Sequence, residues 1–176
     1  MAKIEGLTYG YEEDLGYCVD PTSVNDKDGI SAALVLAQIA TNLKREGRTI
    51  LNYLDDIWSL HGFHGTEQIS LRVSDLAQVS TLLESIRSDP PHEIAGRRIR
   101  SIDDLMKPKD GLPPTDGLRI WLDGEIRIII RPSGTEAKVK CYIEVITHAG
   151  AAAAQSVLDQ LRLPLTQFLV GSYEDK

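Results

Sequence analysis

The stretch EIRIIIRPSGTEAKVKCYIEVI, residues 125–146, decides the fold of the second half of this chain. Its apolar run at 125–130 and its alternating run at 139–146 are typical of two neighbouring strands, and the polar residues between them predict a connecting loop. Just before it, Asp123-Gly124 is the strongest short hairpin signal in the chain and predicts a further strand at 117–122. We therefore expect an antiparallel sheet built around the loop at 131–140.

The loop itself is rich in hydrogen-bond donors. Arg131 offers a planar fork suited to phosphate, Ser133 and Thr135 offer hydroxyls, and Gly134 lets the backbone turn so that N–H groups can converge on an anion. Lys140 shares one strand face with Lys138, because side chains two apart on a strand point the same way. The pattern is that of a phosphate site, although turn chemistry followed by a solvated lysine pair would produce the same residues.

The remaining pattern around this loop predicts a small α+β domain at residues 64–176. We expect an antiparallel sheet and two helices, the second of them disturbed at Pro164. The expected elements are a strand at 66–73, a helix capped by Ser74-Asp75 and stopped at 89–91, a strand at 93–101, a loop at 107–115 and a helix after Gly150.

The first part of the chain predicts an acidic loop followed by two helices. Three adjacent carboxylates, Glu12, Glu13 and Asp14, repel one another, so such a loop either binds something or is left in water. A helix is expected from Asp26 or Asp28 to about residue 46, where Gly47 stops it. Lys27 precedes this helix; an ammonium group there suits anion binding, although most lysines are simply exposed.

A second helix is expected from a Thr49 cap to Leu60, and the domain boundary follows it, between residues 63 and 64. The preceding part, residues 1–63, is predicted to be a partial α/β domain. His61 and His64 are three apart, but no nearby set of Cys or carboxylate residues completes a metal site, so the sequence predicts no metal ligands in this chain.

Composition narrows the classes of function. The 176 residues carry a formal net charge of −7, which argues against a nucleic-acid binder with a broad basic surface. No apolar run approaches the roughly 18 residues that span a bilayer, and the first residues lack the apolar core of a signal peptide. Two cysteines, Cys18 and Cys141, lie far apart, which predicts buried or half-buried thiols in a reduced, cytoplasmic protein.

Residues 131–140 resemble the phosphate-binding loop of the α-D-phosphohexomutases, the phosphoglucomutase and phosphomannomutase family, usually written R-P-S-G-T-E-P-K. Ala137 stands where the family usually has proline. The resemblance implies that this loop binds the substrate phosphate that is not reacting. The residues that it assigns to this role are Arg131, Ser133, Gly134, Thr135 and Lys140.

Two further segments resemble the same family, in the same order. Residues 10–17, GYEEDLGY, are similar to its sugar-binding loop, and the KDG at 27–29 is similar to its helix-opening motif. By position, the resemblance implies that Glu12, Asp14 and Lys27 bind the sugar. Asp14 replaces the serine of the commoner form G-E-x-S-G, and a carboxylate accepts hydrogen bonds from hydroxyls but cannot donate one.

The resemblance implies a mutase that interconverts sugar 1-phosphates and 6-phosphates through a phosphoserine and a bisphosphate intermediate. It further implies Mg²⁺ and an activator of the glucose 1,6-bisphosphate type. The chain has no segment like T-A-S-H-N-P, which carries the serine, and none like D-G-D-x-D-R, which carries the metal. We therefore expect the C-terminal part of such an enzyme, namely the end of its third domain and its fourth, which needs the N-terminal domains as partners and is inactive alone.

Two alternatives stay open from the sequence. The first is a phosphosugar-binding module without catalysis, because a phosphate clamp is present without a nucleophile. The second is a phosphopentomutase or glucose-bisphosphate synthase, because the spelling GYEE at 10–13 is closer to the branch that reads G-F-E-E-A-I-G-Y. The expected ligand is a phosphosugar in each case, and no nucleic acid or membrane partner is expected.

Overall fold

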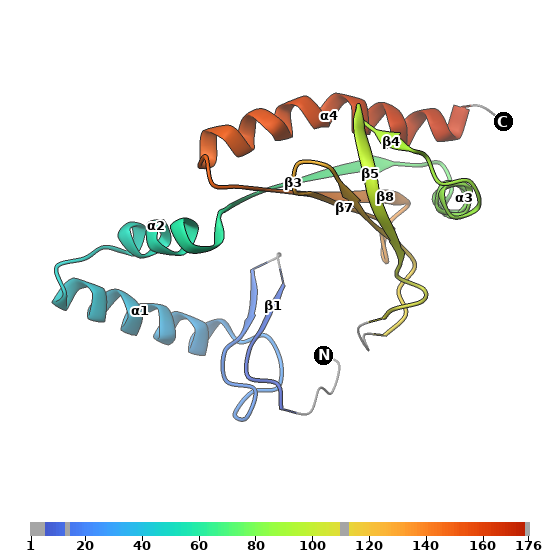
Figure 1. Cartoon of the computed structure of the whole chain (residues 1–176). Helices are drawn as coiled ribbons and strands as arrows, with labels where there is room; N and C mark the ends of the chain where they lie inside the picture. The colour runs from blue at the N-terminus through green and yellow to red at the C-terminus, as the bar shows by residue number, and fades with distance from the viewer. Residues whose placement is uncertain (1–5, 13–14, 110–112, 175–176) are drawn as a thin grey trace. The chain divides into compact units, whose positions relative to one another are not determined.

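The computed structural model describes residues 6–12, 15–109 and 113–174 (Figure 1). It divides into two compact units, Met1–Ile57 and Trp58–Lys176, here called the N-terminal and C-terminal units. The expected functional domain boundary between residues 63 and 64 stays a prediction, since compactness alone does not assign a function to either part. Each unit is described by itself.

The N-terminal unit begins with an antiparallel hairpin of β1 (Gly10–Glu12) and β2 (Gly16–Cys18). The helix α1 (Gly29–Arg45) follows, and the Asp28 carboxylate caps it by accepting hydrogen bonds from two backbone N–H groups, those of Ile30 and Ser31, both at 3.1 Å. Gly47, with φ of +72°, ends this helix in a left-handed conformation that suits glycine. Both ends therefore confirm the expected boundaries.

The second helix, α2 (Ile50–His61), starts at the predicted cap. The Thr49 hydroxyl accepts a hydrogen bond from the Asn52 N–H at 3.1 Å, and the Asn52 amide oxygen accepts one from the Thr49 N–H at 3.0 Å. This reciprocal pair satisfies two donors that the first helical turn cannot satisfy internally.

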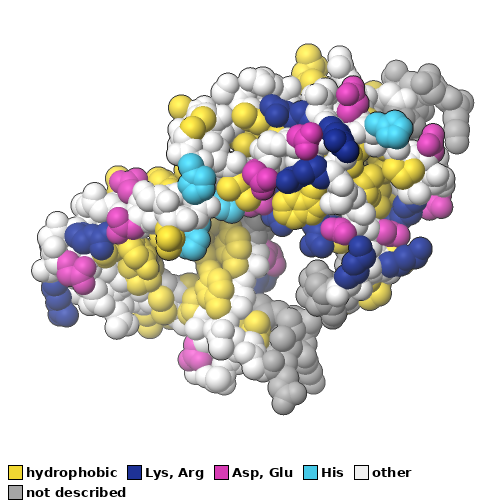
Figure 2. All heavy atoms as spheres, in the orientation of Figure 1, with side chains coloured by type: hydrophobic (Ala, Val, Ile, Leu, Met, Phe, Trp, Pro, Cys, Tyr) yellow, Lys and Arg dark blue, Asp and Glu magenta, His cyan; other side chains and the backbone are white. Residues whose placement is uncertain are grey.

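The helices of the N-terminal unit carry exposed apolar side chains. Ile30 and Leu34 on α1 are 77% and 68% exposed, and Figure 2 shows hydrophobic side chains at the surface of this unit. Within its described residues, the buried hydrophobic side chains are Cys18 and Leu43. The unit therefore has little core of its own.

The C-terminal unit is a six-stranded sheet in the order β3-β8-β7-β6-β5-β4, in which every neighbouring pair is antiparallel. Two helices, α3 and α4, complete the unit, which confirms the expected α+β class with an antiparallel sheet and two helices. The elements are β3 (Phe63–Arg72), α3 (Leu76–Ser88), β4 (Glu93–Ile94), β5 (Arg97–Asp104), β6 (Leu118–Leu122), β7 (Ile126–Pro132), β8 (Lys138–Thr147) and α4 (Ala151–Glu174).

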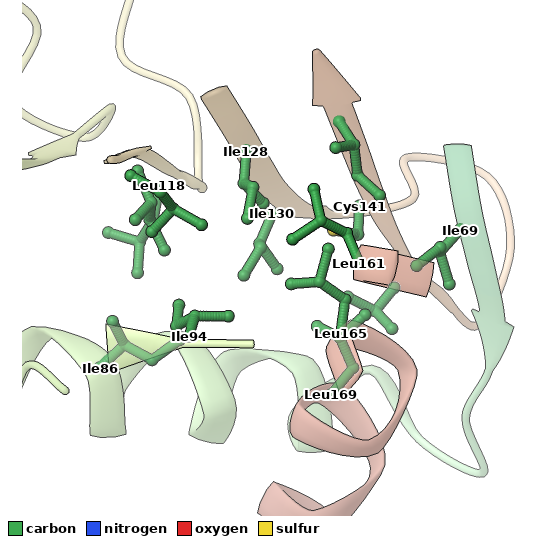
Figure 3. Packing of buried hydrophobic residues seen from close by; sticks show 14 of the residues in the cluster. Ile69, Ile86, Ile94, Leu118, Ile128, Ile130, Cys141, Leu161, Leu165 and Leu169 are labelled. Carbon is green, nitrogen blue, oxygen red and sulfur yellow. The ribbon is translucent and has the colours of Figure 1, made fainter. Parts of the chain in front are cut away.

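The core lies between one face of this sheet and both helices. Alternate residues of β6, β7 and β8 are buried, so each strand presents an apolar face to the helices and a mixed face on the other side. Figure 3 shows Ile128 and Ile130 of β7 facing Leu161 and Leu165 of α4 within one hydrophobic cluster. We call the opposite face the polar face of the sheet.

The hairpin between β6 and β7 is confirmed, but its loop has three residues instead of the expected two. Leu122 pairs with Ile126, so Asp123, Gly124 and Glu125 form the loop, with φ of +86° at Gly124 and +54° at Glu125. A loop of two residues would pair Leu122 with Glu125, which would place a carboxylate on the buried face. The hydrophobic register therefore decides the loop length.

The prediction of one strand at 93–101 is wrong, because the structure divides this segment into β4 and β5. Ala95 and Gly96 form a tight turn with φ of +54° and +69°, the conformation of a type I′ hairpin. The reversal buries Ile94 beside β5. Alanine is an unusual residue at such a position, which is why the sequence pattern gave no turn signal there.

The predicted disturbance at Pro164 is also wrong, because α4 continues through this residue. Leu161 and Leu165, on either side of the proline, are both buried in the core. Packing of the apolar face therefore outweighs the missing N–H donor.

The two cysteines are free and buried, as expected. Burial raises the pKa of the Cys141 thiol to about 12, which keeps it protonated and chemically inert at neutral pH. In the part of the chain that the structure describes, no helix is long and apolar enough to cross a membrane.

Candidate functional site

Two backbone hydrogen bonds hold the loop that follows β7. The Ser133 N–H donates to the Lys138 carbonyl at 2.9 Å, which closes the loop on itself, and the Val73 N–H donates to the Ala137 carbonyl at 3.0 Å. The second bond ties the loop to the end of β3. Backbone bonds to two strands thus fix a segment that has no regular structure of its own.

These anchors leave a run of backbone donors unused. Among the described residues, the N–H groups of Gly134, Thr135, Glu136 and Ala137 donate to no acceptor. The same four residues are exposed. Consecutive backbone N–H groups in an exposed loop can bind an anion.

Four cations lie on the polar face of the sheet beside this loop. The strand register places Arg131 directly opposite Lys140 and places Lys138 directly opposite Arg72. Directly paired residues of antiparallel strands point to the same face. The sheet thus gathers positive charge next to the unused N–H groups, in a chain whose net charge is negative.

Glu136 shows the effect of this charge. Its carboxylate accepts a hydrogen bond from the Lys138 ammonium at 2.7 Å. This bond and the positive charges around it, including those of Arg72 and Lys140, hold the pKa of the Glu136 carboxyl below its usual value. An anion is therefore stabilised at this loop.

The predicted phosphate-binding residues differ in accessibility. Thr135 and Gly134 are exposed, and Arg131 and Lys140 are half-buried with their side chains on the polar face. Ser133 is only 5% exposed, and its N–H is already donated within the loop. Its place in the loop therefore suits support of the backbone, and its contact with phosphate stays a prediction.

Two residues beside the loop were missed from the sequence. Arg72 lies on β3, and the Tyr142 hydroxyl on β8 accepts a hydrogen bond from the Arg131 guanidinium at 2.9 Å. The alternation of polar and apolar residues predicts the face of each strand. Their position beside Lys138 and Arg131 follows only from the pairing of the strands.

In the N-terminal unit, two of the predicted sugar-binding residues contact each other. The Lys27 ammonium donates to the Glu12 carboxylate at 2.9 Å, and both side chains are about half exposed. The backbone N–H of Asp28, next in the chain, donates to the Tyr17 carbonyl at 2.8 Å, which holds the helix start against β2. Asp14, the third predicted sugar-binding residue, lies outside the described residues.

The contact depends on Gly16, which lies opposite Glu12 in the hairpin. A Cβ atom at Gly16 would lie 2.2 Å from Cδ of Lys27, so the lysine side chain crosses directly over this glycine. We expect Gly16→Ala to displace the Lys27 side chain and break its contact with Glu12. The ¹³C resonance of the Glu12 carboxyl should then shift. In the Gly16→Ala background, the further change Lys27→Met should no longer move this resonance.

The matched control is Gly29→Ala, because a Cβ atom there meets no atom of the described residues within 4 Å. It should leave the Glu12 resonance in place. The exposed pair contributes at most about 1 kcal/mol, so both variants should fold. An unchanged Glu12 resonance in Gly16→Ala would show that Lys27 does not cross this glycine.

No metal centre is found in the described ranges, where no group of three His, Cys, Asp or Glu side chains is placed to hold an ion. His64 instead lies 3.0 Å from the Glu144 carboxylate, measured from its Nδ1 atom.

Comparison with known proteins finds one matching family and several relatives. The family model described as "Phosphoglucomutase/phosphomannomutase, C-terminal domain" matches residues 69–161, which include the loop and its flanking strands. A probable phosphomannomutase of Haemophilus influenzae is 43% identical over 144 residues, covering 82% of this chain and 29% of the relative. A phosphoglucomutase of Staphylococcus aureus is 28% identical over 155 residues, covering 80% of this chain and 28% of the relative.

Among solved structures, the open form of the phosphoglucomutase pp63/parafusin from Paramecium superposes with a TM-score of 0.67 at 20% identity. The match covers 94% of this chain and 31% of that one, and it supports the fold alone. The chain spans less than a third of the length of each of these relatives.

Proposed function

The chain belongs to the phosphoglucomutase/phosphomannomutase family and carries its C-terminal domain, and from this we propose that the loop at 131–140 clamps the phosphate of a phosphosugar that is not reacting. The observation that carries the proposal is the loop itself. It sets four unused backbone N–H groups beside Arg131 and Lys140, with Thr135 exposed among them. Charge-assisted hydrogen bonds of this kind contribute about 1.5 to 3 kcal/mol each.

The proposed reaction moves a phosphoryl group twice. A phosphoserine gives its phosphoryl group to a hydroxyl of a sugar monophosphate, and the resulting bisphosphate returns its other phosphoryl group to the serine. The intermediate must be held in both orientations, so a fixed clamp for the remote phosphate is required. Binding energy at that phosphate can then align the reacting one.

The proposal assigns binding to this chain and chemistry to the rest of the enzyme. The serine and the Mg²⁺ ligands would come from the N-terminal domains, and the metal would stabilise charge on the transferring phosphoryl group. A bisphosphate activator would use the same clamp. The chain by itself is proposed not to turn over substrate, and the cytoplasm is its proposed compartment on the sequence grounds given above.

Sugar recognition is proposed for Glu12, Asp14 and Lys27. Glu12 and Lys27 already form one acceptor–donor pair in the described structure, and sugar hydroxyls can exchange hydrogen bonds with both groups. The sugar itself is not specified by these residues. Turnover of glucose, mannose and pentose phosphates by the full-length enzyme would separate a hexose mutase from a phosphopentomutase or a bisphosphate synthase.

The test is an NMR titration of the chain with inorganic phosphate and with glucose 6-phosphate. We expect saturable shifts of the amides of Gly134 to Ala137, and Arg131→Ala should weaken phosphate binding at least about tenfold, because a charged donor is lost. The matched control is Arg162→Ala, which also removes one positive charge, here from an exposed arginine of α4 that pairs with the largely buried carboxylate of Glu67 on β3. It should leave phosphate affinity unchanged.

Equal phosphate affinity in Arg131→Ala and the wild type, or no saturable shift of the loop amides at millimolar phosphate, would contradict the clamp.

The binding-module alternative is tested in the full-length enzyme. Mg²⁺-dependent mutase activity that falls with Arg131→Ala supports the mutase, whereas phosphosugar binding without turnover favours the module.

A further inference from the structure

Arg131 is held by a neutral partner on the neighbouring strand. Its Nη2 atom donates to the Tyr142 hydroxyl at 2.9 Å, and its guanidinium carbon lies 5.4 Å from the centroid of the Tyr142 ring. The register pairs Arg131 with Lys140, so Tyr142 is the diagonal neighbour two residues further along β8. Both side chains are half-buried on the polar face of the sheet.

Three other half-buried arginines of this unit are held by carboxylates instead. Arg87, Arg119 and Arg127 each form an ion pair with at least one carboxylate, at distances of 2.8 to 3.1 Å. Among the described residues, Arg131 forms no ion pair with any carboxylate, although Glu144 is two residues beyond Tyr142 on the same face. Glu144 is instead shared by Arg127 and His64.

Whether an arginine is held by a neutral group or by a carboxylate affects its ability to bind an anion. A carboxylate partner would neutralise the guanidinium and would have to be displaced by an incoming phosphate. A phenol hydroxyl and a ring face restrict the side chain while leaving its positive charge and most of its five N–H donors available. Ordering the long arginine side chain in advance also reduces the entropy lost when the anion binds.

We propose that Tyr142 is a positioning residue that holds the Arg131 guanidinium ready for the phosphate. The proposal rests on the proposed function of the loop at 131–140 and adds to it a residue outside that loop. Tyr142 acts through Arg131 and needs no contact with the ligand.

The test is a double-mutant cycle with Tyr142→Phe and Arg131→Ala, read by the affinity of the chain for inorganic phosphate. Tyr142→Phe keeps the ring and removes one hydroxyl, so we expect affinity to fall about threefold to tenfold in the wild-type background. In the Arg131→Ala background it should have no further effect. The matched control is Tyr53→Phe on α2, which should leave phosphate affinity unchanged.

A second readout needs no ligand. The Nε–H resonance of Arg131 should have a higher order parameter in the wild type than in Tyr142→Phe. Equal order parameters and equal phosphate affinity in these two proteins would overturn the proposal. An equal loss of affinity on Tyr142→Phe in both backgrounds would overturn it as well, since Tyr142 would then act independently of Arg131. If Arg131→Ala leaves affinity unchanged, the clamp itself fails and this proposal fails with it.

Discussion

Ile128→Ala is expected to lower the free energy of unfolding of the C-terminal unit by about 3 kcal/mol. Ile128 is fully buried in β7, at the centre of the sheet, and belongs to the cluster that both helices cover. Truncation removes three methyl or methylene groups and leaves a cavity that close-packed neighbours cannot fill. Urea unfolding followed by tryptophan fluorescence measures the effect, because both tryptophans, Trp58 and Trp121, belong to this unit.

The neighbouring residue provides the control. Ile129 is the next residue on β7 and is half-buried on the polar face, so Ile129→Ala should cost clearly less. Ile128→Val should cost about 1 kcal/mol, since it removes a single methylene. A larger loss for Ile129→Ala than for Ile128→Ala would mean that the strand register of β7 is shifted by one residue.

Much of the C-terminal unit could be predicted because its signals are local. Alternation along 139–146 and the helix caps near residue 75 each depend on a few neighbouring residues, and the structure agrees with them. The failures depend on packing between segments. The three-residue loop at 123–125 follows from keeping Leu122 and Ile126 on one face, and the turn at Ala95 follows from burying Ile94.

Some residues of the candidate site could likewise be predicted from local sequence, and others could not. The donors of the loop at 131–140 are contiguous, so the sequence alone indicates them. Arg72 and Tyr142 could not be predicted as neighbours of Lys138 and Arg131, because their positions depend on the pairing of β8 with β3 and β7. The roles of all these residues stay predictions until the titrations are made.

Gly65→Val is expected to destabilise the C-terminal unit by about 2 to 3 kcal/mol. Gly65 lies within β3, opposite Val145 on the buried face. A Cβ atom at Gly65 would lie 2.7 Å from the Cβ of Ala154 and 3.4 Å from Cδ1 of Leu158. Ala154 is itself a small residue, and this pair of small residues lets α4 approach the strand closely.

Neither residue of this contact can move without disturbing the packing around it. Ala154 is fully buried and its Cβ is fixed to the helix backbone, so a side chain at Gly65 must push α4 away from β3 and loosen the packing of Leu158 behind it. Gly171→Ala is the matched control, because a Cβ atom at this α4 position meets no described atom within 4 Å and alanine favours a helix by up to about 1 kcal/mol. Urea unfolding read by tryptophan fluorescence should show Gly65→Val less stable and Gly171→Ala at least as stable as the wild type. A Gly65→Val protein with unchanged stability would mean that α4 does not pack against β3 at this residue.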